Sequence, residues 1–344
     1  MKFKEILFKL FFLSFLFMLE TSSGQDLHYS QIFSSPLNIN PANAGFFKEK
    51  YRFCLNEKSQ WSSISVPFQT LSFSADTKFK VKHQYSLAGL GILLNRDKAG
   101  DSDFGITQLN VSFSFLYALN NKGNQFLSFG IMPGIAQRTI NLQKLTFGNQ
   151  FDDATSSYNA NLSSNETFST NNFTFFDFSA GMHWSYFNSS GGNHNAGFSV
   201  YHINEPQQSF FNNSDIRLNK KFILYYQSKI SHSLNRLESF PCAMFEMQGN
   251  YKEFIIGSKL RYTYKDSPYE IYAFDFGLYT RVGDAAIVLL GIKYKDVTLD
   301  VSYDINYSKL HTASYYRGGL ELSLQYAINL QKYRRPLKMP CPIF

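Results

Sequence analysis

The side chains best suited to binding a metal ion or moving protons are the histidines, and their spacing matches no known metal motif. The seven are His28, His83, His183, His194, His202, His232 and His311. Two histidines one helical turn apart, as in HExxH, would present both rings to one zinc ion. Neither HExxH nor such a pair occurs in the sequence. The sequence therefore predicts no metal site and no cofactor.

A short acidic cluster is the next candidate for chemistry. Asp97, Asp101 and Asp103 surround Gly100, and carboxylate oxygens are the ligands that calcium prefers. Their spacing does not follow the twelve-residue EF-hand loop. We therefore favour a solvated acidic loop over a calcium site.

His183 lies near three residues that could form a hydrolytic site. In an extended strand it shares one face with Ser179, Ser185 and Asp177, because side chains alternate between the two faces. This grouping could activate a serine, or it could be a hydrogen-bond network on a polar face. No GxSxG motif and no glycine-rich phosphate loop accompanies it. We favour the network and predict that the chain is not an enzyme.

Composition narrows the class of protein further. Lysine and arginine exceed aspartate and glutamate by 33 to 26, a net charge of +7 that is too diffuse to indicate nucleic-acid binding. The three cysteines are widely spaced, which excludes a disulfide scaffold and a cysteine-rich zinc site. Cys54 and Cys242 fall in predicted strands as small packing residues, and a disulfide between them would require those strands to meet. Aromatic residues make up 17% of the chain, a content typical of β-rich proteins.

The elements that would carry these side chains are long strands. Residues 297–307 and 320–330 each alternate without a break between apolar and polar side chains, and similar patterns recur in 109–119, 176–186 and 272–279. Strands of soluble proteins are usually about 5–6 residues long, whereas a tilted strand that crosses a bilayer needs about 9–11. The sequence therefore predicts an all-β fold, a transmembrane antiparallel β-barrel. An exported soluble β-sandwich is the alternative.

We expect about fourteen strands, an even number, as single-chain bacterial barrels have. The predicted strands start near Tyr51, Phe68, Tyr85, Phe104, Phe126, Asn172, Ala196, Lys221, Cys242, Phe254, Tyr269, Ala285, Val297 and Ser314. The long predicted connections, 56–67, 95–103, 141–170 and 204–219, all follow odd-numbered strands. Outer loops of such barrels are long and periplasmic turns short, so both termini are expected in the periplasm.

The ends of the chain differ from its middle. Three lysines, an apolar stretch at 10–19 and small residues before position 25 have the layout of a signal peptide, predicted at 1–24; a membrane anchor is the alternative. Residues 25–50 form a predicted periplasmic or plug-like segment, and 51–330 form the barrel. Residues 331–344 carry three prolines and four basic residues and form a predicted periplasmic tail, which could dock on a partner or lie on lipid headgroups.

The segment after position 24 reads QDLHYSQIFSSPLNINPANAGF and resembles the opening of the PorP/SprF family of type IX secretion membrane proteins. Weaker matches follow in the expected order: Gln60-Trp61, Pro67-Phe68, NRDKAG at 95–100, LSFG at 127–130, HINEP at 202–206 and a closing CPIF. The residues that carry the resemblance or could contact a partner are Gln25, Asp26, Ser30, Gln31, Pro36, Asn40, Pro41, Gly45, Trp61, Pro340, Cys341, Pro342 and Phe344.

The resemblance implies an outer-membrane protein of a gliding or protein-secreting Gram-negative bacterium. Members of this family are expected to help export or anchor large surface proteins such as adhesins, and to contact periplasmic secretion machinery. It implies outer-membrane lipid, secreted cargo and periplasmic proteins as partners, with no nucleic acid and no small-molecule substrate. The alternative function is an outer-membrane channel or hydrophobic-solute transporter.

Overall fold

The computed structural model describes residues 26–60, 66–81, 86–152, 155–159, 161–166, 168–189, 191–211, 213–232, 236–266, 271–308 and 315–329. The predicted signal peptide and the predicted tail lie outside these residues. Among the residues described, no helix is long and apolar enough to span a bilayer.

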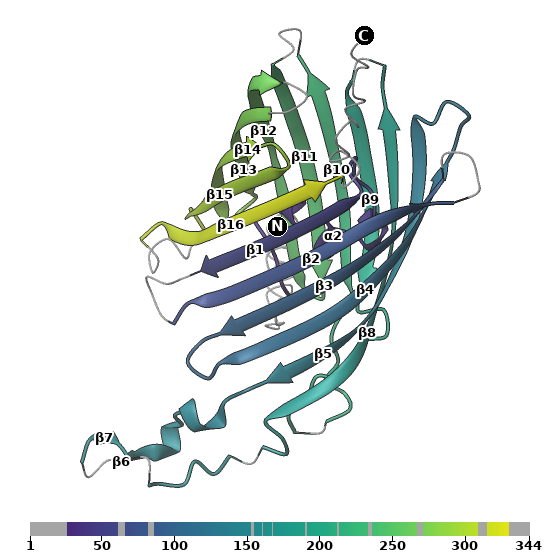
Figure 1. The fold of residues 1–344 in the computed structure, drawn as a ribbon. Helices are drawn as coiled ribbons and strands as arrows, with labels where there is room; N and C mark the ends of the chain where they lie inside the picture. Colours follow the sequence, from purple (N-terminus) through teal and green to yellow (C-terminus); the bar gives the residue numbers. More distant parts are fainter. Residues whose placement is uncertain are drawn as a thin grey trace, which may run out of the picture.

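Fourteen strands form one closed antiparallel barrel, which confirms the predicted fold (Figure 1). They are β1 (Tyr51–Gln60), β2 (Phe68–Lys80), β3 (Leu87–Ala99), β4 (Phe104–Ala118), β5 (Gln125–Thr139), β8 (Asn172–Phe187), β9 (Asn193–Tyr201), β10 (Lys221–Ser231), β11 (Leu237–Gln248), β12 (Tyr251–Asp266), β13 (Ile271–Arg281), β14 (Ala285–Tyr294), β15 (Val297–Asn306) and β16 (Arg317–Ile328). Strand β16 pairs with β1, from Tyr51 opposite Ile328 to Gln60 opposite Gly319, and this pairing closes the barrel.

The two ends of the barrel differ in the length of their connections. At the end where β1 begins and β16 ends, strands are joined by segments no longer than 119–124; we call this the turn end. The opposite end, here the loop end, carries residues 140–171 and 202–220. The first of these contains the two-stranded sheet of β6 (Phe151–Asp152) and β7 (Ser157–Tyr158), which projects from the barrel in Figure 1.

Two predicted loops are partly strand. Strand β1 continues to Gln60 and β3 continues to Ala99. The connections after these strands are therefore shorter than the predicted 56–67 and 95–103. The reason is that polar residues such as Asn95 and Asp97 extend the strands beyond the apolar band, where they still pair with β2 (Asn95 opposite Ser72, Asp97 opposite Thr70). Strand β11 likewise begins at Leu237, before the predicted start at Cys242.

Alternate side chains face opposite sides of the barrel wall, as the sequence pattern predicts. On β15, Val301 and Tyr303 are exposed while Ser302 and Asp304 are buried (1% exposed each). Exposed apolar side chains on the outside suit contact with lipid, and polar or charged side chains line the lumen. The lumen-facing charges pair: Asp275 binds Arg261 (2.7 Å) and Lys259 (2.9 Å), as expected from opposite charges on neighbouring strands.

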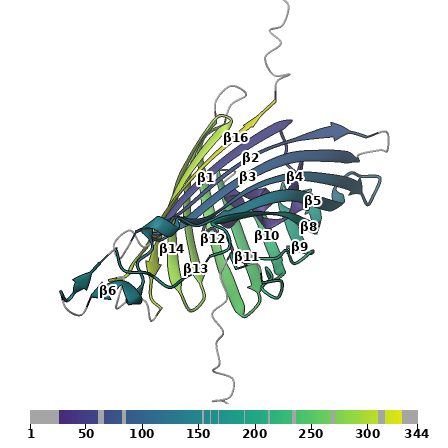
Figure 2. The ribbon, with the colours of Figure 1, turned by 90° about the horizontal axis from the view of Figure 1, so that it is seen from below.

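Residues 26–50, here the lumen segment, contain three short helical turns: η1 (Ile32–Ser34), α2 (Pro36–Ile39) and η2 (Pro41–Asn43). Proline opens both α2 and η2 because its fixed φ suits the first turn and its missing N–H is not needed there. The Asn40 side chain accepts a hydrogen bond from the Ala42 N–H (2.8 Å) and so caps η2. In both views these purple turns lie within the ring of strands (Figures 1 and 2).

Candidate functional site

The lumen segment runs along the inside of the barrel between its two ends. Asp26 contacts His202 and Gln248 at the loop end, with the Asp26 N–H donating to Gln248 Oε1 (3.1 Å). At the other extreme, the Phe47 carbonyl accepts from Lys78 near the turn end. The sequence predicts that this segment enters or caps the periplasmic mouth of the lumen, and its described part extends along the lumen to both ends.

Asp26 is held at the loop end by buried charges. Its carboxylate lies 3.1 Å from His202 Nε2 and 3.8 Å from Lys221 Nζ. The Asp177 carboxylate lies 2.9 Å from the other ring nitrogen of His202, Nδ1. Burial alone would raise the pKa of Asp26, but Lys221 and His202 outweigh it and the pKa is lowered. Burial would lower the pKa of His202, but hydrogen bonds to Asp177 and Asp26 raise it to about 9. His202 therefore binds both carboxylates as a cation.

Ser30 and Gln31 bind the wall formed by β15 and β16. The backbone N–H groups of both residues donate to the Glu321 carboxylate, at 2.7 Å and 3.1 Å. The Ser30 hydroxyl donates to Asp304 (2.7 Å), and Arg281 Nη2 contacts the same hydroxyl at 2.8 Å. All five groups are buried, so each of these charged partners would carry a large desolvation cost without the others.

Asn40 fixes the middle of the segment to β8 and β9. Its amide nitrogen donates to the carbonyls of Met182 (2.8 Å) and Phe198 (3.2 Å), which lie opposite each other on the two strands. One side chain thereby satisfies a pair of wall carbonyls. Asn40 is fully buried, which explains why an amide is needed at this position.

Serine hydroxyls on the wall donate hydrogen bonds to the backbone of residues 41–44. The Ser112, Ser128 and Ser114 hydroxyls donate to the carbonyls of Pro41 (2.8 Å), Ala42 (2.8 Å) and Ala44 (2.6 Å) in turn. The Pro41 carbonyl also accepts from the Ala44 N–H within η2 (3.2 Å), and the wall hydroxyls give all three carbonyls a partner in the barrel.

Glycines let the segment approach the wall. A Cβ built on Gly130 would meet the backbone of Pro41 and Ala42, and one built on Gly89 would meet the Ala44 carbonyl, closer in both cases than real Cβ atoms come. Gly45 adopts a φ of +71°, which favours glycine, and its N–H donates to Asp76 (2.8 Å). Close backbone contact between the segment and the wall thus depends on residues without side chains.

The segment is anchored at the turn end by a buried ion pair. Arg52 Nε and Nη2 donate to the two carboxylate oxygens of Asp76 at 2.9 Å and 2.7 Å, and Nη2 also reaches the Asn43 carbonyl at 3.0 Å. This two-pronged geometry is the strong form of an arginine–carboxylate pair. The Arg52 side chain joins the barrel wall to the segment.

The structure brings together motif residues that are far apart in the sequence. His202 of HINEP meets Asp26, Asn95 of NRDKAG donates to Asn38 (2.8 Å), and Ser128 and Gly130 of LSFG contact Ala42. Of the candidate residues, the structure places Asp26, Ser30, Gln31, Pro36, Asn40, Pro41 and Gly45 in the lumen. Gln25, Trp61, Pro340, Cys341, Pro342 and Phe344 lie outside the described residues.

The proposed serine–histidine grouping is not assembled as a triad. Asp177 bonds to His202, while His183 Nδ1 lies 2.8 Å from the Tyr225 hydroxyl. In the acidic cluster, Asp103 pairs with Lys144 (2.7 Å) and Lys98, and Asp97 accepts from Thr70 (2.6 Å). Within the described residues, no three His, Cys, Asp or Glu side chains gather as metal ligands would. Cys54 and Cys242 are buried free cysteines.

Sequence patterns did not single out several buried charges that hold the segment. Lys58 Nζ donates to the His28 carbonyl (3.3 Å), and Lys221 Nζ donates to the Leu27 carbonyl (2.8 Å) and pairs with Glu246 (3.0 Å). These side chains lie on the lumen face near strand ends. In the sequence, a charged residue near the end of a strand resembles a solvent-exposed one. Their position in the two-residue alternation is the signal that could have identified them.

The contacts of His202 that fix the loop-end part of the lumen segment should weaken at alkaline pH. The pKa of His202 rises from 6.5 to about 9 on folding, so its contribution is fully present below pH 6.5 and is lost as the pH passes about 9. Asp26 has a lowered pKa, so its contribution persists at alkaline pH and is lost only in strong acid. We expect amide hydrogen exchange of residues 27–32, corrected for intrinsic rates, to speed up as the pH is raised through about 9.

The matched control for this experiment is His202→Gln, which should abolish the alkaline transition and leave residues 27–32 exchanging faster at neutral pH. Unchanged protection of these amides well above pH 9 in the unaltered protein would show that His202 does not hold the segment.

No curated protein matches this chain. Similar solved structures include the toluene transporter TodX of Pseudomonas putida, with 12% identity, 85% of this chain and 93% of that chain covered, and a TM-score of 0.49. Another is a FadL homologue of Pseudomonas aeruginosa, with 11% identity, 84% and 93% covered, and a TM-score of 0.42. The family model described as type IX secretion system membrane protein PorP/SprF matches residues 21–326, which include the described lumen segment and nearly the whole barrel. The chain therefore belongs to the PorP/SprF family of type IX secretion system membrane proteins, and it is an outer-membrane β-barrel.

Proposed function

We propose that this protein helps to export large secreted proteins through the type IX system, or to anchor them on the cell surface. In this proposal the loop end faces outward and both chain termini lie in the periplasm. The length difference between connections at the two ends supports this orientation, because outer loops of such barrels are long and periplasmic turns are short. The protein itself carries out no reaction.

The observation that carries the proposal is an apolar surface at the loop end. The two long connections contact each other through Phe168, which stacks on Phe211 with ring centroids 5.0 Å apart, and Phe210 meets Phe173 of β8 edge-on at 4.9 Å. We call the exposed apolar side chains of these connections the loop surface; they are Phe151, Tyr158, Leu162, Phe211 and Ile216. Exposed apolar groups rimmed by polar residues are typical of protein-binding sites.

The loop surface fits a protein cargo better than a soluble ligand. Its apolar residues stand among serine, asparagine and threonine, a mixture found in adaptable recognition surfaces. Aromatic side chains on such surfaces supply much of the binding energy once a partner covers them.

The bore is closed in this proposal, so that cargo is handled at the loop end and does not pass through the barrel. Support comes from the lumen segment, which binds opposite walls: the backbone N–H groups of Ser30 and Gln31 bind β16, the Asn40 side chain binds β8 and β9, and the Ala44 carbonyl binds β4. A passive channel would need this segment to leave. The predicted tail, including Pro340 and Phe344, remains a candidate for docking on periplasmic machinery.

Replacing Phe151, Tyr158 and Phe211 together by serine tests the role of the loop surface. We expect surface display of the cargo to fall at least tenfold, because the substitutions remove most of the aromatic anchors that a partner would cover. Display is measured by antibody labelling of intact cells, and the amount of folded barrel by its mobility in unheated SDS gels.

The control variant carries Thr155→Ala and Ser157→Ala in the same hairpin and should display cargo normally. A tag inserted after Ser156 should be labelled on intact cells. Normal display by the triple variant would refute the role of the loop surface, and a tag reached only in ruptured cells would show that the orientation is inverted.

A further inference from the structure

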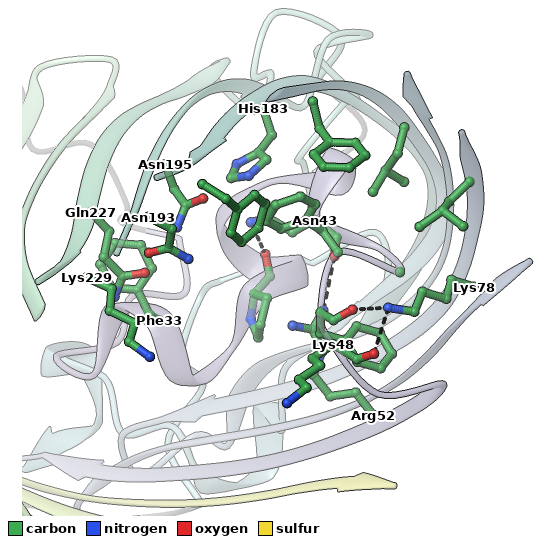
Figure 3. A pocket seen from close by; sticks show the side chains of 18 of the residues that line it. Phe33, Asn43, Lys48, Arg52, Lys78, His183, Asn193, Asn195, Gln227 and Lys229 are labelled. Atoms are coloured by element: carbon green, nitrogen blue, oxygen red, sulfur yellow. Dashed lines mark hydrogen bonds between the residues drawn. The ribbon is translucent and has the colours of Figure 1, made fainter. Parts of the chain in front are cut away.

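A cavity of about 620 Å³ opens inside the barrel at the turn end, beside the lumen segment (Figure 3). It lies between the lumen segment and the lumen faces of β1 to β5 and β8 to β10. We call it the turn-end cavity. Its volume falls within the range of about 300–1,000 Å³ that is usual for sites binding small ligands. The side chains of the lumen segment do not fill this space.

Aromatic rings form the apolar part of the cavity. Phe46 lies against His183 (ring centroids 4.4 Å apart) and Phe187 (6.4 Å), and Phe33 meets Tyr225 edge-on at 5.9 Å. Phe33 and Phe46 come from the lumen segment, and the others come from the wall. A ligand here would therefore contact the segment and the barrel together, and an apolar or aromatic group would fit this part of the cavity.

One wall of the cavity is rich in side-chain amides. Asn193 and Asn195 on β9 lie opposite Lys229 and Gln227 on β10 in the strand register, and Figure 3 shows all four side chains beside the cavity. Asn195 Oδ1 is buried and has no hydrogen-bond partner among the described residues. It is an acceptor without a donor, and a buried acceptor of this kind normally has one.

His183, in the wall of the same cavity, carries a second unmatched acceptor. The Tyr225 hydroxyl donates its proton to Asn43 Oδ1 (2.9 Å), so the contact between His183 Nδ1 and that hydroxyl (2.8 Å) requires a hydrogen on Nδ1. In the neutral ring Nε2 is then an acceptor. This atom is buried, in a side chain only 3% exposed, and has no partner within the described residues. The two acceptors point to a ligand with N–H donors.

The charged residues that line the cavity are positive, with the acids Asp76 and Glu238 behind them. Lys48, Arg52, Lys78 and Lys229 line it, and no aspartate or glutamate does so among the residues described. Arg52 and Lys229 are already paired with Asp76 and Glu238. Lys78 donates to the carbonyls of Phe47 and Lys48, which takes two of its three protons. Lys48 is exposed, and its ammonium pairs with no described acid. A carboxylate would complement Lys48 and Lys78.

We propose that the turn-end cavity binds a short peptide segment of a partner protein, one that carries an apolar or aromatic side chain and a carboxylate. The backbone N–H groups of the peptide donate to Asn195 Oδ1 and His183 Nε2. Its side chain packs among Phe33, Phe46 and Phe187, and its carboxylate binds Lys48 and Lys78. The proposal goes beyond the cargo role of the loop surface and does not depend on it, because the two sites lie at opposite ends of the barrel.

A small probe with an aromatic ring, a carboxylate and one amide N–H is N-acetyl-L-phenylalanine, tested on the full-length protein in lipid nanodiscs by ligand-observed NMR. Two analogues each lack one feature: N-acetyl-L-phenylalaninamide has no carboxylate, and 3-phenylpropionate has no N–H. We expect saturable binding of the first probe and about tenfold weaker binding of each analogue, the effect of losing a charge-assisted or buried hydrogen bond. Empty nanodiscs correct for uptake into lipid.

Variants locate the binding within the cavity. Lys48→Gln with Lys78→Gln should weaken N-acetyl-L-phenylalanine about tenfold without weakening its amide, whereas Lys122→Gln, at an exposed site in the turn 119–124, should change nothing. Asn195→Leu keeps the size of the side chain and removes the unmatched acceptor. It should weaken binding of the probe and leave thermal stability unchanged or raised, because the lost acceptor has no partner in the protein. If the amide served only a structural role, the substitution would lower stability and leave binding of the probe unchanged.

Three results would overturn the proposal. If 3-phenylpropionate bound as tightly as N-acetyl-L-phenylalanine, the site would be one for apolar acids rather than peptides. If N-acetyl-L-phenylalaninamide bound as tightly, the lysines would not recognise a carboxylate. Absence of saturable binding by N-acetyl-L-phenylalanine, with Asn195→Leu less stable than the unaltered protein, would show that the wall amides have a structural role.

Discussion

Replacing Gly130 by valine should displace residues 41–44 of the lumen segment and leave the barrel intact. A side chain at this position points into the lumen, where a Cβ would overlap the backbone of Pro41 and Ala42. Backbone cannot rotate out of the way as a side-chain end can, so the segment must move. Valine itself suits a strand, and β5 should still pair with β4 and β8.

The size of this effect follows from the cost of overpacking. Forcing extra methyl groups into a filled interior costs about 1–3 kcal/mol, which raises the population of the displaced segment by about 5- to 150-fold. The Ser128–Ala42 hydrogen bond is lost in the same displacement. Limited proteolysis of the nanodisc-bound protein, followed by mass spectrometry, should show cleavage within residues 38–47 accelerated by that factor.

Gly134→Val is the matched control, four residues further along the same strand and on the same face. Its Cβ would meet the Asn110 side chain and not the lumen segment, so cleavage within 38–47 should stay at the rate of the unaltered protein. If Gly130→Val were cut no faster than Gly134→Val, the close packing of the segment against β5 would be refuted.

The barrel could be predicted from the sequence because its stabilising contacts follow a local rule. Each strand alternates lipid-facing and lumen-facing residues over its own length, so Val301 and Ser302 reveal their environments without knowledge of any other strand. Fourteen strands, their order and most of their starts follow from this alternation. It failed where strands continue beyond the apolar band, as at Asn95, because polar side chains on both faces resemble a loop.

The course of the lumen segment could not be predicted in the same way. Its turns are three or four residues long, too short for any periodicity, and its contacts lie far away in the chain: Asn40 binds carbonyls at Met182 and Phe198. Leu37 and Ile39 are buried, but nothing near them in the sequence identifies the side chains that they contact. The family motifs named Asp26 and the HINEP residues separately, and only the fold shows that Asp26 and His202 meet.

The conductance of the purified protein in planar bilayers tests most directly whether the lumen segment closes the barrel. We expect the full-length protein to give no large, steady steps, because residues 26–50 bind several sides of the lumen through buried hydrogen bonds. Deleting residues 27–44 should produce such steps, since the charges on Glu321, Asp304 and Arg281 would then be solvated by water in an open lumen. Mobility in unheated SDS gels confirms that the deleted protein still forms a barrel, and synthetic peptide 26–45 added back should reduce the current. Large, steady conductance by the full-length protein would contradict the account.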